Sequence, residues 1–255
     1  MSEYITIDDA KIRFKRIEGD AEKPTLVFLH EGLGCIEMWK DFPAELCRLT
    51  RCSGLLYDRQ GFGGSSSLSR KRDINYVQDY ACSELTTLVQ KLIPNKAHIL
   101  IGHSDGASIA LIYGATEQPR LRGIVSEAAH VFVEEKTIKG IKAADRQYER
   151  YGPKGLTKYH GSRTHAVFKG WSVTWLSDWF RSWNIEALLP AVSCPVLAIQ
   201  GADDAYGTIG QIDSICSQVS GQVEPVFIPD CGHRAHHQCP EMALPRMREF
   251  IRRIS

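Results

Sequence analysis

The feature that most constrains this chain is a regular alternation of short apolar runs with longer amphipathic stretches. Runs such as Thr25–Leu29 (TLVFL) are apolar throughout, as expected for strands buried on both faces. The stretches between them carry apolar residues at three- and four-residue spacing, which is typical of helices. Such alternation predicts right-handed crossovers and a mostly parallel sheet with helices on both faces. The expected strands are Tyr4–Ile7, Lys11–Ile17, Thr25–Leu29, Cys52–Tyr57, Ala97–Ile101, Leu121–Ser126, Cys194–Gln200 and Val223–Ile228, and the expected helices are Met38–Leu49, Tyr76–Leu92, Ser104–Thr116, Ile209–Val219 and Pro240–Ile254.

One region interrupts the alternation. From about Val131 to about Pro190 the sequence has helical patterns and no strand-like run. This region lies between the sixth and seventh expected strands, so a helical insertion here is expected to cover the carboxyl ends of the strands and shape a substrate pocket. We therefore expect a core of residues 1–130 and 191–255 and a helical cap over residues 131–190.

Composition narrows the choice of partners and compartment. The 255 residues include 31 Lys and Arg against 30 Asp and Glu, and a formal net charge of +1 argues against nucleic acid or an anionic membrane as the main partner. The N-terminal residues have no signal-peptide pattern, and no apolar run approaches the length of a bilayer span. The eight cysteines do not form a disulfide framework. We expect a soluble cytoplasmic protein with reduced thiols.

The strongest local signal is Gly102-His103-Ser104-Asp105-Gly106, which follows an expected strand and precedes an expected helix. In that context G-x-S-x-G predicts a nucleophile elbow, a tight turn in which the residues two before and two after the serine must lack bulk. The serine hydroxyl is then exposed at a helix N-terminus, where free N–H groups favour developing negative charge.

A serine needs a base, and the base needs an orienting acid. On this kind of sheet the expected chain order is serine, acid, histidine. Asp203 and Asp204 follow the seventh expected strand, and His233 follows the eighth. Both loops lie at the carboxyl ends of parallel strands, where the active sites of open α/β sheets assemble.

With these motifs the chain resembles the α/β-hydrolase superfamily, and in particular the capped serine hydrolases that include small-molecule esterases, enol-lactonases and ring-fission-product hydrolases. The resemblance implies a sheet of about eight strands, a helical cap inserted after the sixth strand, and no cofactor. It spans nearly the whole chain in the family's order. The motifs that carry it are His30-Glu31-Gly32-Leu33-Gly34, Asp58-Arg59-Gln60-Gly61-Phe62-Gly63, the elbow around Ser104, Gly201-Ala202-Asp203-Asp204 and Gly232-His233.

Residue roles follow from the resemblance. Ser104 matches the family's nucleophile and His233 its general base. The family's spacing after the strand selects Asp204 as the acid, with Asp203 as the alternative. His236 and His237 lie near His233, but only His233 has the family's spacing, so we expect these two at the rim or the surface.

The oxyanion hole needs two backbone N–H donors. The resemblance implies the N–H of Asp105, which follows the nucleophile, and that of Gly32, with Leu33 as the alternative to Gly32. Two residues depart from the common family pattern: Glu31 stands where glycine is usual, and Asp105 where a neutral residue is usual. These carboxylates disfavour anionic substrates, bind a polar substrate group, or are solvated or paired with an arginine such as Arg59.

Aromatic residues mark the expected cap. Trp171, Trp175, Trp179 and Trp183 repeat every four residues and would form one stripe on a continuous helix. The stripe indicates either a pocket wall or packing of the cap on the core. The expected pocket residues are Leu33, His130, Phe132, Trp171 and Trp175.

A run of possible zinc ligands accompanies the histidine, namely Cys231-x-His233-x-x-His236-His237-x-Cys239. Coordination of His233 would remove the base of an otherwise complete triad, so we expect no metal.

The sequence predicts a serine hydrolase acting on a small carboxylic ester, thioester or lactone, as a monomer or homodimer. Hydrolysis of a carbon–carbon bond with the same triad, and a non-catalytic ligand receptor, remain alternatives. Haloalkane dehalogenase and epoxide hydrolase activities are excluded, because both need a carboxylate where Ser104 stands.

Overall fold

A computed structural model describes residues 3–255. Its centre is an eight-stranded sheet with the order β1-β2-β4-β3-β5-β6-β7-β8. β1 and β2 pair antiparallel, β2 pairs antiparallel with β4, and the remaining neighbours are parallel. The expected mostly parallel α/β fold is thus confirmed. The strands are β1 (Glu3–Ile7), β2 (Ala10–Ile17), β3 (Thr25–Leu29), β4 (Ser53–Tyr57), β5 (His98–His103), β6 (Leu121–Glu127), β7 (Val196–Gly201) and β8 (Val223–Ile228).

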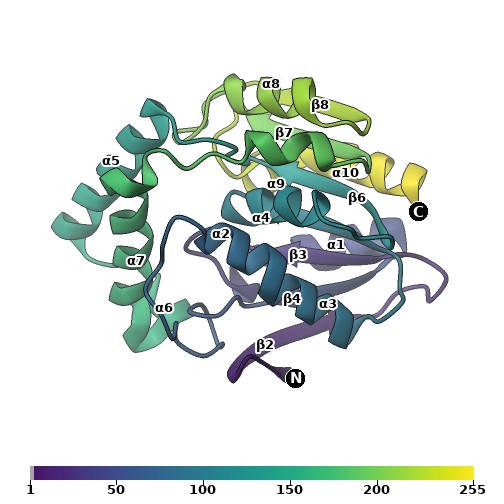
Figure 1. Cartoon of the computed structure of the whole chain (residues 1–255), viewed down its shortest axis with the longest axis horizontal. Helices are drawn as coiled ribbons and strands as arrows, with labels where there is room; N and C mark the ends of the chain where they lie inside the picture. The colour runs from purple at the N-terminus through teal and green to yellow at the C-terminus, as the bar shows by residue number, and fades with distance from the viewer. Residues whose placement is uncertain (1–2) are drawn as a thin grey trace.

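Helices cover both faces of this sheet (Figure 1). Leu26 and Phe28 of β3 pack with side chains of α1 and α10, whereas Val27 and Leu29 face the cluster that holds α2, α3, α4 and α8. This alternation follows from the two-residue period of a strand. No helix within residues 3–255 has the length and apolar character needed to cross a bilayer. The core helices are α1 (Phe42–Thr50), α2 (Tyr76–Asp79), α3 (Thr86–Leu92), α4 (Asp105–Gly114), α8 (Ile209–Gln218), α9 (Ala235–Gln238) and α10 (Pro240–Ile254).

Two expected helices differ from the structure. The expected helix Met38–Leu49 is divided into a 3-10 turn, Ile36–Trp39, and α1, because Lys40 between them has a φ of 52°, outside the helical region. The expected helix Tyr76–Leu92 is continuous but contains a π-helical stretch, η2 (Tyr80–Leu85), between α2 and α3. Hydrophobic periodicity finds such elements but does not register a single-residue break or a change of helix pitch.

Helices also fill the chain between β6 and β7, and α5, α6 and α7 lie together at one end of the molecule (Figure 1). The expected single tryptophan stripe does not form. α7 ends at Leu176, because Ser177 adopts an extended conformation with ψ of 144°. Trp179 beyond it is 46% exposed, whereas Trp183 is buried. The elements here are α5 (Glu135–Tyr151), α6 (Thr157–His160), η3 (Gly161–Arg163), α7 (Thr164–Leu176), η4 (Asp178–Phe180) and η5 (Glu186–Ala191).

Candidate active site

Ser104 occupies the turn between β5 and α4. Its backbone has φ 54° and ψ −120°, a conformation that is costly for a residue with a side chain. Its N–H donates to the carbonyl oxygen of Glu127 at 2.9 Å, which ties the turn to the end of β6. Only glycine fits on either side: a Cβ on Gly102 would lie 2.4 Å from the oxygen of Gly106, and one on Gly106 would lie 2.0 Å from the oxygen of Leu29. The geometry is that of a nucleophile elbow.

His233, in the loop after β8, is hydrogen-bonded to Asp204, in the loop after β7. The Nδ1 atom lies 2.9 and 2.8 Å from the two carboxylate oxygens, so Nδ1–H donates to Asp204. Asp204 also accepts from the Gln200 side chain at 2.6 Å and from Tyr206 N–H at 2.8 Å. Burial alone would raise the pKa of Asp204, but the hydrogen bond and charge of His233 lower it. Of the two candidate acids, Asp204 is the one that contacts His233, whereas Asp203 is exposed.

Ser104 and His233 line the same pocket, which has a volume of about 410 Å³. No hydrogen bond joins the Ser104 hydroxyl to His233 in the described part of the chain. Such bonds are often long before substrate binds. The pocket is enclosed by loops at the carboxyl ends of the strands and by α5 and α7. It is lined by Glu31, Gly32, Leu33, Met38, His103, Ser104, Asp105, His130, Thr137, Ile141, Leu156, Trp171, Trp175, Asp203, Ala205, Tyr206, Gly232, His233, Arg234 and Gln238.

Four of the five residues expected in the pocket lie in its wall, namely Leu33, His130, Trp171 and Trp175. Phe132 does not. Its backbone forms an isolated bridge with Asn184, and its carbonyl accepts from the Gln211 side chain, so Phe132 joins the helical region to α8. Its nearness to His130 in sequence suggested a pocket position, but the sequence did not show this long-range pairing.

Gly32 and Asp105, the two residues expected to supply the oxyanion donors, both line the pocket. Asp105 is the first residue of α4, so its N–H has no acceptor inside the helix. Gly32 lies in the loop after β3, beneath Trp171 of α7. A Cβ on Gly32 would lie 2.6 Å from Cδ1 of Trp171, so a larger residue there would require Trp171 to move. No hydrogen bond from Gly32 N–H is found among the residues that the structure describes.

The side chain of Asp105 is buried and belongs to a polar chain. Its Oδ2 accepts from the Tyr76 hydroxyl at 3.2 Å, and Tyr76 in turn accepts from the indole N–H of Trp175 at 2.9 Å. Arg59, also fully buried, places Nη1 4.0 Å from the same Oδ2. These hydrogen bonds therefore link Trp175 of the helical region, through Tyr76, to Asp105, the residue that follows the candidate nucleophile.

Glu31 faces His103, which precedes the candidate nucleophile. Its Oε2 lies 3.8 Å from Nδ1 of His103, and Nε2 of His103 donates to the carbonyl oxygen of His233 at 2.9 Å. Burial would raise the pKa of Glu31, but the nearby His103 holds it well below its usual range. We did not predict this contact of His103 from the sequence, although the position of His103 inside the elbow motif indicates that it lies near the site.

A second buried carboxylate–histidine pair lies behind the candidate triad. Both oxygens of Glu127, at the end of β6, lie 2.8 and 2.9 Å from Nδ1 of His236. The His236 ring packs against Trp39 and Phe42, with centroid separations of 4.9 and 5.0 Å. Burial would raise the pKa of Glu127, but the charge and hydrogen bond of His236 lower it to about 2. We expected His236 at the rim or the surface, whereas the structure buries it.

The possible zinc ligands after β8 do not converge. His233 binds Asp204, His236 binds Glu127, and the His237 ring bonds the Met38 carbonyl oxygen. Another group, made of Cys35, Glu37 and Asp58, has ligand atoms within 4.8 Å of one another. Both of its carboxylates pair with Arg13, and Asp58 also accepts from the N–H groups of Ile36 and Gly64. Those contacts indicate that Asp58 holds the adjoining turns in place.

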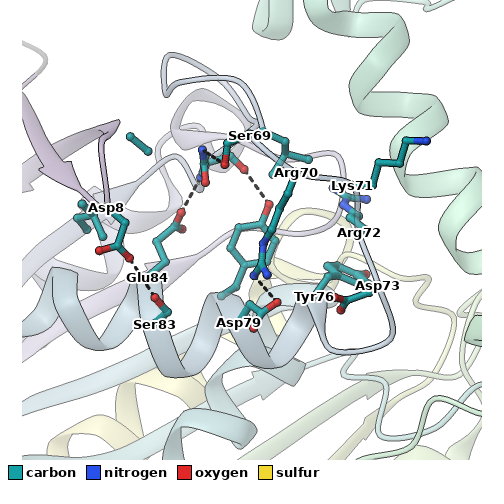
Figure 2. Close-up of a pocket in the computed structure, with 15 residues that line it drawn as sticks. Asp8, Ser69, Arg70, Lys71, Arg72, Asp73, Tyr76, Asp79, Ser83 and Glu84 are labelled. Carbon is teal, nitrogen blue, oxygen red and sulfur yellow. Dashed lines mark hydrogen bonds and ion pairs between the residues drawn. The ribbon is translucent and has the colours of Figure 1, made fainter.

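A smaller cavity of about 220 Å³ lies beside α2 and η2, and Tyr76 is among the residues that line it. Figure 2 shows the Asp8–Ser83 and Arg70–Asp79 contacts at its edge. Glu84 is buried in its wall; one carboxyl oxygen accepts from Gln60 N–H at 2.9 Å, and the other has no partner among residues 3–255. Burial raises the pKa of Glu84 to about 7.

Comparison with known proteins bears on this geometry. The model of the alpha/beta hydrolase family matches residues 26–244. The chain belongs to the alpha/beta hydrolase family. This hydrolase is 28% identical over 254 residues to 2-succinyl-6-hydroxy-2,4-cyclohexadiene-1-carboxylate synthase of Escherichia coli, covering 90% of this chain and 94% of that protein. It is 25% identical over 227 residues to the alpha/beta hydrolase domain-containing protein aho-3 of Caenorhabditis elegans, covering 89% of this chain but only 57% of aho-3.

A solved structure shows the same fold. The thermophilic esterase from Thermogutta terrifontis superposes on this hydrolase with a TM-score of 0.74 and 21% identity, covering 100% of this chain and 99% of the esterase. The names of the relatives include a synthase as well as hydrolases, so kinship supports a hydrolase of this family and leaves the substrate to be argued from the site.

Proposed function

We propose that this chain is a serine hydrolase that cleaves a small carboxylic ester, thioester or lactone through an acyl-enzyme. The observation that carries the proposal is the Asp204–His233 hydrogen bond at the edge of the pocket that also holds the elbow serine. Ser104, Asp204 and His233 follow the ends of three different strands, in the chain order expected of such a triad, which supports the proposal.

The reaction would run in two halves. Ser104 attacks the substrate carbonyl while Nε2 of His233 takes the hydroxyl proton, and the leaving alcohol, thiol or ring oxygen departs with a proton from His233. Asp204 keeps the Nδ1 proton in place and stabilises the imidazolium. Water, activated by His233, then releases the acyl group from Ser104.

The developing oxyanion would be held by the N–H groups of Gly32 and Asp105. In this proposal residues 131–190 act as a cap, because Trp171 and Trp175 of α7 form one wall of the pocket. A cap in that position excludes water and selects a small-molecule substrate.

The test is Ser104→Ala assayed with p-nitrophenyl acetate and butyrate. We expect activity to fall by several orders of magnitude while the circular dichroism spectrum and melting temperature stay close to those of the wild type. A fluorophosphonate probe should label the wild type and leave Ser104→Ala unlabelled, and mass spectrometry should place the adduct on Ser104. Turnover near the wild-type level in Ser104→Ala would contradict the mechanism.

The same protein separates the alternatives. A vinylogous diketone assayed beside the ester distinguishes carbon–carbon bond hydrolysis, which would show the higher kcat/KM on the diketone. A folded protein in which Ser104 takes up no fluorophosphonate would instead favour the ligand-receptor alternative.

A further inference from the structure

His130 is a buried polar side chain in the pocket that the proposed mechanism does not use. It lies just after β6, is 3% exposed, and lines the pocket together with Ser104. Its Nδ1 atom is buried without a partner, and its other ring nitrogen makes no hydrogen bond to the rest of residues 3–255. Buried polar atoms are usually satisfied, so an orphaned imidazole in a binding pocket points to a ligand atom that completes it.

The position of this ring is tightly held. The backbone N–H of His130 donates to the Ser108 hydroxyl at 3.1 Å, and that hydroxyl donates to the His130 carbonyl oxygen at 2.6 Å. The ring packs against the edge of Trp175 with a centroid separation of 5.2 Å, and Trp175 is itself fixed by its hydrogen bond to Tyr76. A preorganised group of this kind binds a ligand at little conformational cost.

The ring offers hydrogen bonds without a charge. Burial, and then the neighbouring charge of His233, lower the pKa of His130 to about 4. At neutral pH one ring nitrogen therefore carries a proton and the other a lone pair. Hydroxyl and oxo oxygens suit such a ring, whereas a plain alkyl chain would leave both nitrogens unpaired.

We propose that His130 is a specificity-determining residue that binds an oxygen substituent, hydroxyl or oxo, on the acyl group of the substrate. The inference rests on the proposed ester hydrolysis and names its substrate class. The His130 and His233 ring centroids lie 6.1 Å apart, and both rings line the pocket with Ser104, so both can reach the same small acyl group. This favours the β carbon, whose substituents lie about 3–4 Å from the carbonyl carbon.

The test compares phenyl esters of butyrate, 3-hydroxybutyrate and 3-oxobutyrate, with each kcat/KM divided by the rate of alkaline hydrolysis of the same ester. We expect the wild type to prefer at least one oxygenated ester over butyrate by about ten-fold or more. His130→Phe keeps a planar ring but loses both nitrogens, so the ratio should fall to about one. His130→Asn, a second variant with a shorter polar side chain, should retain part of the preference.

His98→Phe is a matched control. His98 is also buried, but its ring nitrogens face the Lys96 carbonyl oxygen and the Tyr113 hydroxyl at the other end of β5. Any loss of stability from replacing a buried imidazole should appear there with the ester ratio unchanged.

The outcomes separate the two proposals. Equal normalised kcat/KM for the three esters in the wild type, or an undiminished preference in His130→Phe, would overturn the role of His130 while leaving ester hydrolysis intact. Failure of all three esters together with an unlabelled Ser104 would instead overturn the proposed function.

Discussion

Two carboxylate–histidine pairs in this hydrolase have nearly the same hydrogen-bond geometry and different surroundings. In the Asp204–His233 pair and in the Glu127–His236 pair, Nδ1 of the histidine lies 2.8 Å from the nearest carboxylate oxygen. The His233 side chain is 16% exposed and lines the pocket, whereas that of His236 is 3% exposed and lies among aromatic rings.

The comparison shows that the hydrogen bond alone does not make a catalytic pair. A histidine acts as a base only where its other nitrogen reaches the reacting atoms. The Glu127–His236 pair instead joins α9 to the end of β6, and the carbonyl of Glu127 also holds Ser104 N–H. We infer that one pair is positioned for chemistry and that the other supports the strand end behind it.

The sharpest way to break this comparison is to replace each histidine by asparagine. His233→Asn should lower kcat by about 10⁵-fold, because the base is lost, with little change in melting temperature. His236→Asn should retain most of the activity per folded molecule but lose about 1–3 kcal/mol of stability, since the ring packing on Trp39 and Phe42 is lost and the side-chain hydrogen bond to the buried Glu127 carboxylate is weakened. Steady-state kinetics and urea unfolding of both variants measure the two effects. The reverse pattern would show that the two histidines have been assigned the wrong roles.

The acid of the candidate triad allows a smaller and equally direct test. Asp204→Asn should lower kcat by about 10⁴-fold, because an amide no longer holds the required tautomer of His233. The neighbouring Asp203→Asn is the matched control and should change kcat by less than about three-fold, since Asp203 lines the pocket but is exposed, and no hydrogen bond joins its side chain to His233 among residues 3–255. A larger loss in Asp203→Asn than in Asp204→Asn would reverse the choice between them.

The fold and the residues of the candidate triad followed from local patterns. Buried central strands such as β3 are apolar throughout, and the antiparallel β2 alternates between buried and exposed residues, so both kinds of strand were visible in the sequence. The elbow needs glycine at fixed offsets from Ser104, and the acid and base must follow particular strands. Each of these signals is contained in a short window of residues.

What the sequence did not show depends on contacts between distant residues. Glu127 and His236 are 109 positions apart, and nothing in either segment indicates that they pair. Phe132 lies outside the pocket, where its backbone pairs with Asn184. The tryptophan repeat does not lie on one helix, because the extended residue Ser177 ends α7. Such outcomes are decided by tertiary packing and not by local pattern.

A third buried carboxyl group sharpens the comparison, because no histidine is hydrogen-bonded to Glu84 among residues 3–255. Burial raises its pKa to about 7 from an ordinary 4.5, the opposite direction from Glu127. Between these two pH values the folded protein keeps a proton that the unfolded chain has lost, so the stability of the wild type falls as pH rises through this window. The loss amounts to about 3 kcal/mol when the window has been crossed.

Glu84→Gln should remove this loss, because an amide stays neutral and its oxygen can still accept from Gln60 N–H. We expect the melting temperature of Glu84→Gln, relative to the wild type, to increase from pH 5 to pH 8. Glu127→Gln is the matched control and should be less stable than the wild type at both pH values, because the carboxylate that accepts from the His236 ring and backbone is replaced by an amide. If the difference in melting temperature between Glu84→Gln and the wild type stayed the same from pH 5 to pH 8, the buried Glu84 carboxyl would ionise as readily as one with a histidine partner.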